Sequence, residues 1–578
     1  SSQLLGSQND MATIRLYIIM ACVLVIGVAL GACIMCLPSS SADTSGFSAE
    51  NAAGYLKEIS KKPHSVFDEE NHEEVRQYLL TTLRDMGYEV EEHNWTPEEH
   101  GFSDNLSPEG LLDEDRPVEY DVKNLWVKIP GKSDTGMLIM AHYDSRGHAT
   151  RTGEIPGSYG AADDGYGVSV LLEIARLYKD VPQSALENSI YLCFADAEET
   201  GMYGSKLEAM HNETLKNNVN FVMNVEARGV KGPVYMFETS TNNRNVIRLY
   251  KNADMPFAYS LATAVYTVMP NFTDFTSMLE IGKAGINFAV LDNLYYYHTP
   301  EDNFSNINKN SLQHYGSQIM PIIKEYTTNA AYSDMDYFEA GEDSVFFNIL
   351  PTVMAVYTET AGIVFAVLSA LLFAAAAFFL VKKGKIRLKH TLIAVGVIFA
   401  AMLGAAAFGF VLSYLVALIG GVPWKLTYIR VPLSGIPFAL SLIVVLGLLL
   451  WFAIRKNGKN SFFKWEYLTA GAFISLLLAL ITTFALVGAS FLFLWPAVLA
   501  SIVMLVNAFT GNYYIGHALM SLCSLVILLL NVPILYSLLL AVTTGGLLAV
   551  NLLFVVALAI MIPVALAQKD LTIQKAAE

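Results

Sequence analysis

The sequence predicts an α/β domain, with a mostly parallel central sheet flanked by helices, followed by an all-α polytopic membrane domain. Hydrophobic residues make up 53% of the 578 residues, which is more than a water-soluble protein of this length usually contains. Short β-rich stretches alternate with helical ones between residues 40 and 350, and nearly continuous apolar stretches follow. The acidic and basic residues are also distributed unevenly between these two parts of the chain. From Pro351 onward there are 13 Lys and Arg and 4 Asp and Glu, which leaves 24 and 49 before that point.

The first segment, SSQLLGSQND (1–10), precedes Met11 and is interpreted as an artificial leader. The following stretch, 14–36, contains no charged residue after Arg15. Because about 20 apolar residues are enough to cross a bilayer as a helix, 14–36 is predicted to be a transmembrane helix. A cleaved signal peptide is the alternative, although the apolar stretch is long for one.

Residues 40–350 are predicted to form the α/β domain. Apolar residues at helical spacing, such as Val168, Leu171 and Leu172, indicate a helix. The β-rich stretches are NLWVKI (124–129), MLIMAHYD (137–144), SIYLCFA (189–195), NFVMNVE (220–226) and INFAVL (286–291). Such an alternation predicts a largely parallel sheet covered on both faces. Open α/β sheets place their functional sites at the carboxyl ends of the strands.

Residues 353–566 are predicted to form a helical membrane domain, and 567–578 a C-terminal tail. Seven spans are expected, or eight if Pro533 separates two helices instead of kinking one. The expected spans are roughly 355–381, 391–419, 433–454, 466–487, 489–509, 516–543 and 546–566. Together with 14–36 this gives eight or nine spans in the chain.

Basic residues gather in two loops of the membrane domain. One loop contains Lys382, Lys383, Lys385, Arg387 and Lys389, and the other contains Arg455, Lys456, Lys459 and Lys464. Loops rich in Lys and Arg stay in the cytoplasm, and these two loops lie two spans apart, as one shared side requires. The α/β domain, one span earlier, is therefore expected outside the cytosol. That side is the cell exterior in a bacterium, or the vacuolar or reticulum lumen in a eukaryote.

Five segments of the α/β domain carry the His, Asp and Glu side chains that a metal site needs. They are MAHYDSR with His142 and Asp144, GSYGAADDGYG with Asp163 and Asp164, YLCFADAEETGMYGS with Asp196, Glu198 and Glu199, FVMNVEARG with Glu226, and NLYYYHTPEDN with His298. Each has a plain structural alternative when taken alone. Either Asp163 or Asp164 can cap the helix that follows, and His142 or His298 can be an ordinary surface or packing residue. Adjacent carboxylates at a strand end, however, repel one another unless a cation compensates.

Two histidines and several carboxylates are a ligand set that suits Zn²⁺. Two such ions about 3.5–4 Å apart need a bridging carboxylate between them. A further carboxylate that is not a ligand must take the proton of the attacking water. The adjacent pair Glu198 and Glu199 can divide these roles, with one residue as ligand and the other as base.

The order His-x-Asp, Gly-Ala-x-Asp-Asp, Glu-Glu-x-Gly, Glu and Tyr-His-Thr resembles that of the co-catalytic zinc aminopeptidases related to secreted bacterial leucine aminopeptidases. EARGVKGPVYMFETS, NFTDF and YYYHTPEDN are most similar to its membrane branch, the vacuolar and endoplasmic-reticulum membrane metallopeptidases. The resemblance covers roughly residues 50–330, together with the arrangement of one span before and many after. It implies a zinc aminopeptidase-like fold and two Zn²⁺ ions per chain.

The resemblance also implies a role for each residue of the predicted metal site. His142 and Glu226 would bind one zinc ion, Glu199 and His298 would bind the other, and Asp163 would bridge the two, which leaves Asp164 as its neighbour. Soluble relatives commonly have Asp where this chain has Glu226. The longer side chain must therefore still reach the metal.

The same resemblance makes Glu198 the general base and Asp144 the carboxylate behind His142. The expected reaction is hydrolysis of peptide bonds at N-termini by a metal-activated water. Tyr266, which precedes NFTDF, is a candidate oxyanion donor, and Arg228 and Glu238 are candidates for lining the substrate pocket. All three also have ordinary interpretations, as a core tyrosine and as charged side chains on a strand face or in solvent.

Two other function classes remain as alternatives: a transporter with a regulatory extracytoplasmic domain, and a receptor-like protein whose peptidase-like domain is inactive. Few ionisable residues fall inside the predicted spans, which disfavours transport. The acidic character of the first part argues against nucleic acid as a partner, because phosphate binding needs clustered Lys and Arg. The expected partners are peptide substrates and the lipid bilayer.

Overall fold

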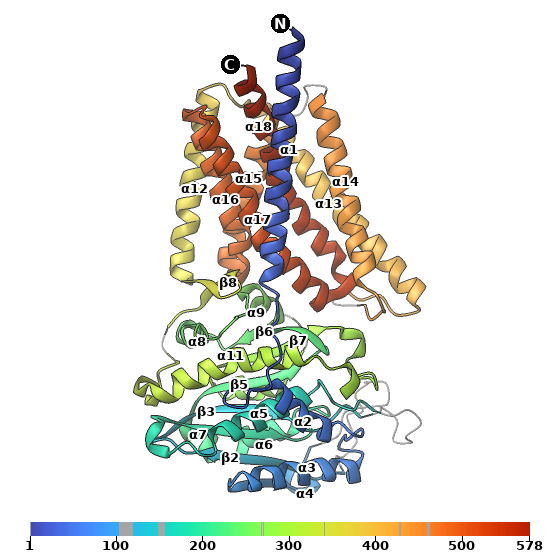
Figure 1. The fold of residues 1–578 in the computed structure, drawn as a ribbon, viewed down its shortest axis with the longest axis vertical. Coiled ribbons are helices and arrows are strands. Elements are labelled where there is room, and N and C mark those ends of the chain that lie inside the picture. Colours follow the sequence, from blue (N-terminus) through green and yellow to red (C-terminus); the bar gives the residue numbers. More distant parts are fainter. Residues whose placement is uncertain are drawn as a thin grey trace. The chain divides into compact units, whose positions relative to one another are not determined.

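The computed structural model describes residues 2–102, 119–147, 157–267, 269, 271–339, 341–426, 429–458 and 463–577. The chain forms two compact units (Figure 1). The α/β unit is Met35–Thr358, and the helical unit joins Ser1–Ile34 to Glu359–Glu578. A mixed sheet with flanking helices and a separate unit of long apolar helices confirm the predicted fold class.

A seven-stranded sheet forms the centre of the α/β unit. Its strands are β1 (Val90–Trp95), β2 (Val122–Ile129), β3 (Ser133–His142), β4 (Asn188–Ala195), β5 (Val219–Ala227), β6 (Lys231–Thr239) and β7 (Gly285–Asp292). They lie in the order β1-β2-β4-β3-β5-β7-β6. The central strands β4, β3, β5 and β7 run parallel to one another. Antiparallel pairing is confined to the edges, where β1 and β2 flank β4, and β6 flanks β7.

Helices cover both faces of this sheet. On one face α2 (Ala49–Ile59), α5 (Gly165–Tyr178) and α11 (Lys309–Thr328) pack on one another and enclose the larger apolar core. On the other face lie α6 (Tyr203–His211), α7 (Glu213–Asn218) and α10 (Asp274–Glu280). The remaining elements of the unit are α3 (Glu69–Asp85), α4 (Pro97–His100), α8 (Arg244–Tyr250), α9 (Ser260–Tyr266) and the hairpin β8 (Ser344–Leu350) and β9 (Val353–Thr358).

The parallel strands bring the predicted metal-site segments to one edge of the sheet. His142 is the last residue of β3, Asp196 follows the last residue of β4, and Glu226 is the penultimate residue of β5. His298 lies in the loop after β7. Because parallel strands all end on the same side, these segments meet without any long excursion of the chain.

The hairpin β8–β9 differs from the sequence prediction, which began the membrane domain at 353. Val353–Thr358 pairs antiparallel with Ser344–Leu350. Its β-branched and aromatic residues favour a strand over the first turn of a membrane helix. The α/β unit therefore extends to Thr358.

The helical unit consists of α1 (Ser2–Cys33), α12 (Glu359–Lys382), α13 (Leu388–Gly420), α14 (Gly435–Gly458), α15 (Lys464–Ala485), α16 (Phe491–Phe509), α17 (Tyr513–Val542) and α18 (Leu547–Ala577). Among the described residues, seven helical stretches are long and apolar enough to cross a membrane. The last stretch, Tyr513–Leu571, contains α17 and most of α18. Pro533 lies inside α17 and does not end it, and the chain breaks instead at the 3₁₀ turn Thr543–Gly546.

Helix α1 starts before the predicted 14–36 segment and ends three residues short of it, because Ser2–Cys33 is one continuous helix. It packs on α17 through two glycines one turn apart. A Cβ atom on Gly27 would lie 2.6 Å from Leu528, and one on Gly31 would lie 2.9 Å from Val532. Small residues at such spacing allow close contact between helices in a membrane.

The basic segments of the helical unit lie at one end of the bundle. Lys464 forms an ion pair with Asp570 near the end of α18, and the Arg387 main-chain N–H donates to Glu466 Oε1 at 3.1 Å. Lys459, which the sequence analysis places in the second basic loop, is outside the described residues. The loops that precede α13 and α15 thus share one end of the unit.

Gly204 gives a test of the packing that supports the turn after β4. A Cβ atom on Gly204 would lie 2.3 Å from the Asp196 main-chain oxygen and 2.5 Å from Asn124 Oδ1. We expect Gly204→Ala to destabilise the protein by about 1–3 kcal/mol, seen as a lower midpoint of thermal unfolding in detergent. Gly54→Ala in α2 is the matched control, since no described atom lies within 4 Å of the added Cβ. It should be neutral or slightly stabilising, and equal losses in both variants would contradict the close contact.

Candidate metal centre

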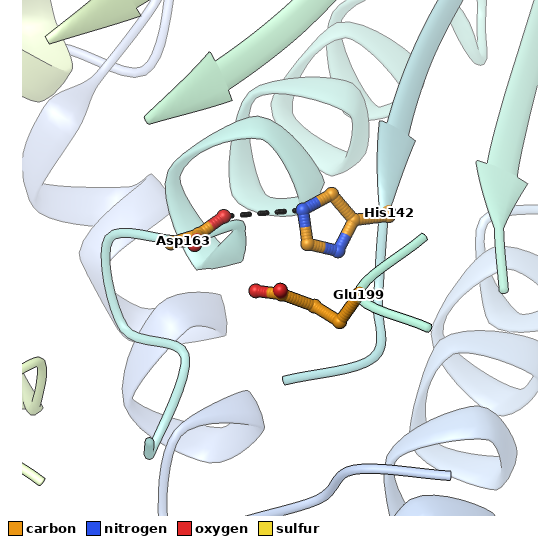
Figure 2. Close-up of side chains that lie close together, drawn as sticks. All are labelled: His142, Asp163 and Glu199. Carbon is orange, nitrogen blue, oxygen red and sulfur yellow. Dashed lines mark hydrogen bonds and ion pairs between the residues drawn. The ribbon is translucent and has the colours of Figure 1, made fainter. Parts of the chain in front are cut away.

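Five predicted ligand side chains meet at the carboxyl edge of the sheet. They come from the end of β3 (His142), the loop before α5 (Asp163), the turn after β4 (Glu199), the end of β5 (Glu226) and the loop after β7 (His298). His142 is fully buried, and Asp163, Glu199 and Glu226 are 5–6% exposed. Figure 2 shows His142, Asp163 and Glu199 pointing toward a common space.

His142 presents one ring nitrogen to the carboxylates and the other to the main chain. Its Nε2 lies 3.1 Å from Asp163 Oδ1 and 3.5 Å from Glu226 Oε2. Its Nδ1 lies 2.9 Å from the main-chain oxygen of Asp144. Because a carbonyl oxygen can only accept, Nδ1 carries the proton and donates this hydrogen bond. In the neutral ring Nε2 then keeps a lone pair directed at the carboxylates, as metal-binding histidines require.

His298 stands on the opposite side of Asp163. Its Nε2 lies 3.2 Å from Asp163 Oδ2 and 3.1 Å from Glu199 Oε2. The ring stacks on Tyr297 with centroids 3.6 Å apart, and the residue has a φ of +58°. A left-handed backbone is unusual for a non-glycine residue and clusters at functional sites. Asp163 therefore directs one carboxylate oxygen to each histidine.

Several atoms of this cluster are buried without a hydrogen bond. Among the described residues, Asp163 Oδ2, Glu199 Oε1 and His298 Nε2 have no hydrogen-bond partner. Burial raises the pKa of the Glu199 and Glu226 carboxyls, and the charge of Asp163 raises both further. Unsatisfied buried polar atoms and crowded carboxylates both destabilise a fold unless a cation is present. The ligand atoms of His142, Asp163 and Glu199 lie within 4.8 Å of one another, and the whole set suits Zn²⁺.

Asp164, and not Asp163, is the residue that caps α5. Its Oδ1 accepts from the Gly167 main-chain N–H at 3.0 Å, so Asp164 is the N-cap. Its Oδ2 accepts from the His142 main-chain N–H at 3.2 Å. Asp164 also lies close to His142 and Glu226, but both of its oxygens are held by the main chain. The side chain of Asp163 is the one turned toward the histidines.

Asp144 supports two parts of the centre at once. Its carboxylate lies 3.3 Å from His142 Nδ1. Its Oδ1 and Oδ2 also accept the main-chain N–H groups of Glu198 and Glu199 at 3.0 and 3.1 Å. These hydrogen bonds hold the turn after β4, in which the side chains of Glu198 and Glu199 point to different partners. Glu199 faces His298, while Glu198 Oε2 lies 3.8 Å from His142 Nε2 with its side chain 13% exposed.

Sequence reasoning missed Asp302 and Arg146. Asp302 is 1% exposed, and its carboxylate accepts the main-chain N–H groups of Ala162 and Asp163 at 2.7 and 3.1 Å. It therefore ties the loop of His298 to the loop of Asp163, and its place in the same HTPED segment was the available signal. Arg146 donates from Nη1 to the main-chain oxygen of Glu199 at 2.7 Å. Its position two residues after Asp144 gave no comparable sign.

The three candidate substrate residues lie around the same edge. Tyr266 ends α9 and packs edge-to-face on Phe237, with centroids 4.9 Å apart. Burial raises the pKa of its hydroxyl, and the charges of Glu238, Glu226 and Glu198 raise it further. Arg228 follows β5, and its main-chain N–H donates to Val290 at 2.9 Å. Glu238 on β6 is 6% exposed, and burial raises its pKa to about 7.

Comparisons with known proteins find similarity to peptidases in the α/β unit. Residues 124–323 match the family model described as Peptidase family M28. The chain is 28% identical over 267 residues to a vacuolar membrane protease of Meyerozyma guilliermondii, a match that covers 45% of this chain and 26% of that protein. It is 27% identical over 333 residues to endoplasmic reticulum metallopeptidase 1 of Mus musculus, covering 55% and 35%. The matched part thus spans only about a quarter to a third of these relatives.

A solved structure also aligns with part of the chain. It is a zinc aminopeptidase from Bacillus subtilis, with 16% sequence identity and a TM-score of 0.37. The alignment covers 50% of this chain and 97% of that one.

Asp302 gives a test of how the Asp163 loop is held. In Asp302→Asn only one side-chain oxygen remains to accept the Ala162 and Asp163 N–H groups, so the Asp163 loop should loosen. We expect zinc affinity to fall about 10–100-fold, measured by competition with a chromogenic chelator. Glu301→Gln, at the exposed neighbouring position, is the control and should bind zinc as the wild type does. Wild-type affinity in Asp302→Asn would show that the loop does not depend on this carboxylate.

Proposed function

We propose that this chain, whose α/β unit carries a Peptidase family M28 domain, is a membrane-anchored dizinc metallopeptidase that removes N-terminal residues from peptides. The observation that carries the proposal is the position of Asp163. Its two carboxylate oxygens lie 3.1 and 3.2 Å from the Nε2 atoms of two different histidines. A carboxylate with one oxygen toward each of two ligand sets is the arrangement that bridges a metal pair.

Each zinc ion would then have one histidine, one glutamate and a share of Asp163. His142 and Glu226 would hold the first ion, and His298 and Glu199 the second. Glu226 reaches His142 Nε2 to within 3.5 Å, so the longer side chain at this position does not prevent it from sharing a metal with His142. Three protein ligands per ion leave a position for substrate or water, as in other catalytic zinc sites.

Bound zinc would supply Lewis acidity, which polarises the scissile carbonyl and lets a water molecule react near neutral pH. We assign Glu198 as the general base, and its position beside the ligand set, with Oε2 3.8 Å from His142 Nε2, supports this role. Its carboxylate would take the proton of the attacking water and return it to the nitrogen of the leaving amine. Asp144 fixes the main chain of Glu198 and so the position of this proton carrier.

The charge of the site favours substrates with a free N-terminus. Glu198 and Glu238, which are not assigned as zinc ligands, both lie near Tyr266, and an α-ammonium group is the part of a peptide that complements their charge. Tyr266 and Arg228 are the neighbouring donors, and Tyr266 is our candidate for stabilising the oxyanion. The expected substrates are therefore peptides with an unblocked amino terminus.

The distribution of basic residues supports an α/β unit outside the cytosol. Lys382, Lys383, Lys385, Arg387, Lys389, Arg455, Lys456 and Lys464 flank the loops at one end of the helical unit. The chain enters the α/β unit at residues 34–35, just after the C-terminal end of α1. It leaves the unit at residues 358–359, just before the N-terminal end of α12. Cytoplasmic basic loops would place the α/β unit on the other side of the membrane. In a eukaryote this would be a vacuolar or reticulum lumen, as the names of the two relatives suggest, and in a bacterium the cell exterior.

Separate substitution of the two adjacent glutamates by glutamine tests which one is the general base and which one is a zinc ligand. Glu198→Gln should lower kcat by about 10²–10⁴-fold while two zinc ions remain bound, because the base is not a ligand. Glu199→Gln should lose zinc as well as activity. The measurements are turnover of an aminoacyl amide and metal content by atomic emission. Loss of zinc in Glu198→Gln would mean that Glu198 is itself a ligand and that the roles are misassigned.

Blocking the substrate tests the preference for N-termini. Acetylation of the α-amino group should lower kcat/KM by about 100-fold or more, because the acidic site then loses its cationic partner. The assay compares free and acetylated peptides of the same sequence, with and without a chelator. Similar chelator-sensitive rates for both would remove the aminopeptidase assignment and leave a metallopeptidase of another kind.

A further inference from the structure

A row of buried polar side chains crosses three strands of the sheet and ends at Glu226. Asn224 on β5 is in register with Asn287 on β7, and Asn287 is in register with Glu238 on β6. Asn224 and Asn287 are fully buried, and Glu238 is 6% exposed. Asn224 lies two residues before Glu226, so both side chains leave β5 on the same face.

Hydrogen bonds join this row into one chain. Asn224 Nδ2 donates to Glu226 Oε1 at 3.3 Å and to Asn287 Oδ1 at 3.1 Å. Asn287 Nδ2 donates in turn to Glu238 Oε2 at 2.9 Å and to Thr273 Oγ1 at 3.0 Å. The carboxylate of Glu238 fixes which end of the Asn287 amide faces it, and this fixes Asn224. If either amide were reversed, oxygen would face oxygen along the row.

The surroundings of Asn224 make a purely structural role a poor explanation. Its neighbour in register on β3 is Met140, and this face of the sheet otherwise packs an apolar cluster that includes Trp126 and Phe275. Asn224 Oδ1 is buried without a hydrogen-bond partner among the described residues. A buried amide with an unsatisfied oxygen destabilises the fold. What Asn224 gains is the pair of hydrogen bonds from Nδ2.

One of these hydrogen bonds holds Glu226. Oε1 is held by Asn224, and Oε2 lies 3.5 Å from His142 Nε2 on the metal side. A glutamate has one more rotatable bond than an aspartate, so its carboxylate loses more freedom when it binds a metal. A fixed donor on Oε1 removes part of that loss before the metal arrives.

We propose that Asn224 is a positioning residue that orients Glu226 for zinc, and that Asn287 and Glu238 hold the Asn224 amide in the orientation this requires. The inference rests on the proposed zinc function of the site. Glu238 would then help to orient Glu226 through Asn287 and Asn224, in addition to any contact with substrate.

The first experiment is zinc binding by Asn224→Asp in the detergent-solubilised full chain. The substitution keeps the size of the side chain but replaces the donor by an oxygen that faces Glu226 and Asn287. We expect one of two zinc equivalents to bind about 10–100-fold more weakly, and the other to bind nearly as in the wild type. Isothermal titration with zinc, repeated against a competing chelator, separates the two equivalents.

The matched control is Asn220→Asp, the same change on the same strand. Asn220 is 5% exposed, and its Nδ2 donates to the main-chain oxygens of Tyr332 and Asp334 at the amino end of β5. This variant should lose thermal stability but keep both zinc affinities. Equal loss of zinc in the two variants, or full zinc affinity in Asn224→Asp, would overturn the inference.

Glu238 provides a test by conservative rescue. Glu238→Gln keeps an oxygen that can accept from Asn287, so zinc affinity should stay within about threefold of wild type. Glu238→Leu removes the acceptor and should weaken the same zinc equivalent as Asn224→Asp, by about tenfold. Identical affinities in the two variants would exclude a role for the Glu238 oxygen. A wild-type chain that binds no zinc would reject the proposed function itself, whereas tight binding in both wild type and Asn224→Asp rejects only the positioning role.

Discussion

Mutual repulsion among buried carboxylates is the constraint on which the rest of this structure depends. Asp163, Glu198, Glu199 and Glu226 converge at one edge of a sheet, and burial raises the pKa of all three glutamates. A parallel sheet makes this convergence unavoidable, because every strand delivers its terminal side chains to the same side. The basic side chains beside this cluster are His142, His298 and Arg146, whose Nη1 lies 3.5 Å from Glu199 Oε2, and the proposed metal pair would balance the remaining charge. The acidic edge therefore supplies the residues of the proposed activity, and it also destabilises the fold.

The carboxylates of this region fall into two groups with different partners. Asp144, Asp164 and Asp302 accept main-chain N–H groups, and so hold the Glu198–Glu199 turn, the end of β3 and the Asp163 loop. Asp163, Glu199 and Glu226 instead turn toward His142 and His298. Main-chain hydrogen bonds to a carboxylate are strong because the acceptor is charged. The first group therefore fixes the main chain around the site, and the second is left to face the proposed metal pair.

The sequence was sufficient to predict the α/β sheet, the apolar helices and the set of side chains that meet at the sheet edge. Strand ends that carry His142 or Glu226 are visible as apolar runs that stop at a polar residue. The choice between Asp163 and Asp164 was not visible in this way, because both precede the same helix. Only the contact of Asp164 with Gly167 shows which one caps it.

Other features depended on contacts between distant segments, which local patterns do not contain. Asp302 and Asn224 act through main-chain and amide groups of other loops and strands. The extension of the α/β unit to Thr358 depended on pairing between β8 and β9. The break between α17 and α18 at Thr543–Gly546, by contrast, falls between the spans 516–543 and 546–566 expected from the sequence, and Pro533 lies inside α17. Prolines inside membrane helices are tolerated when neighbouring groups satisfy the freed main chain.

The central claim is that Asp163 stands between two zinc ions. Anomalous diffraction at the zinc edge, from crystals of the zinc-loaded full chain, tests it most directly. The account predicts two anomalous peaks about 3.5–4 Å apart, one beside His142 and Glu226 and the other beside His298 and Glu199, with Asp163 between them. A single peak, or peaks that do not touch Asp163, would contradict it.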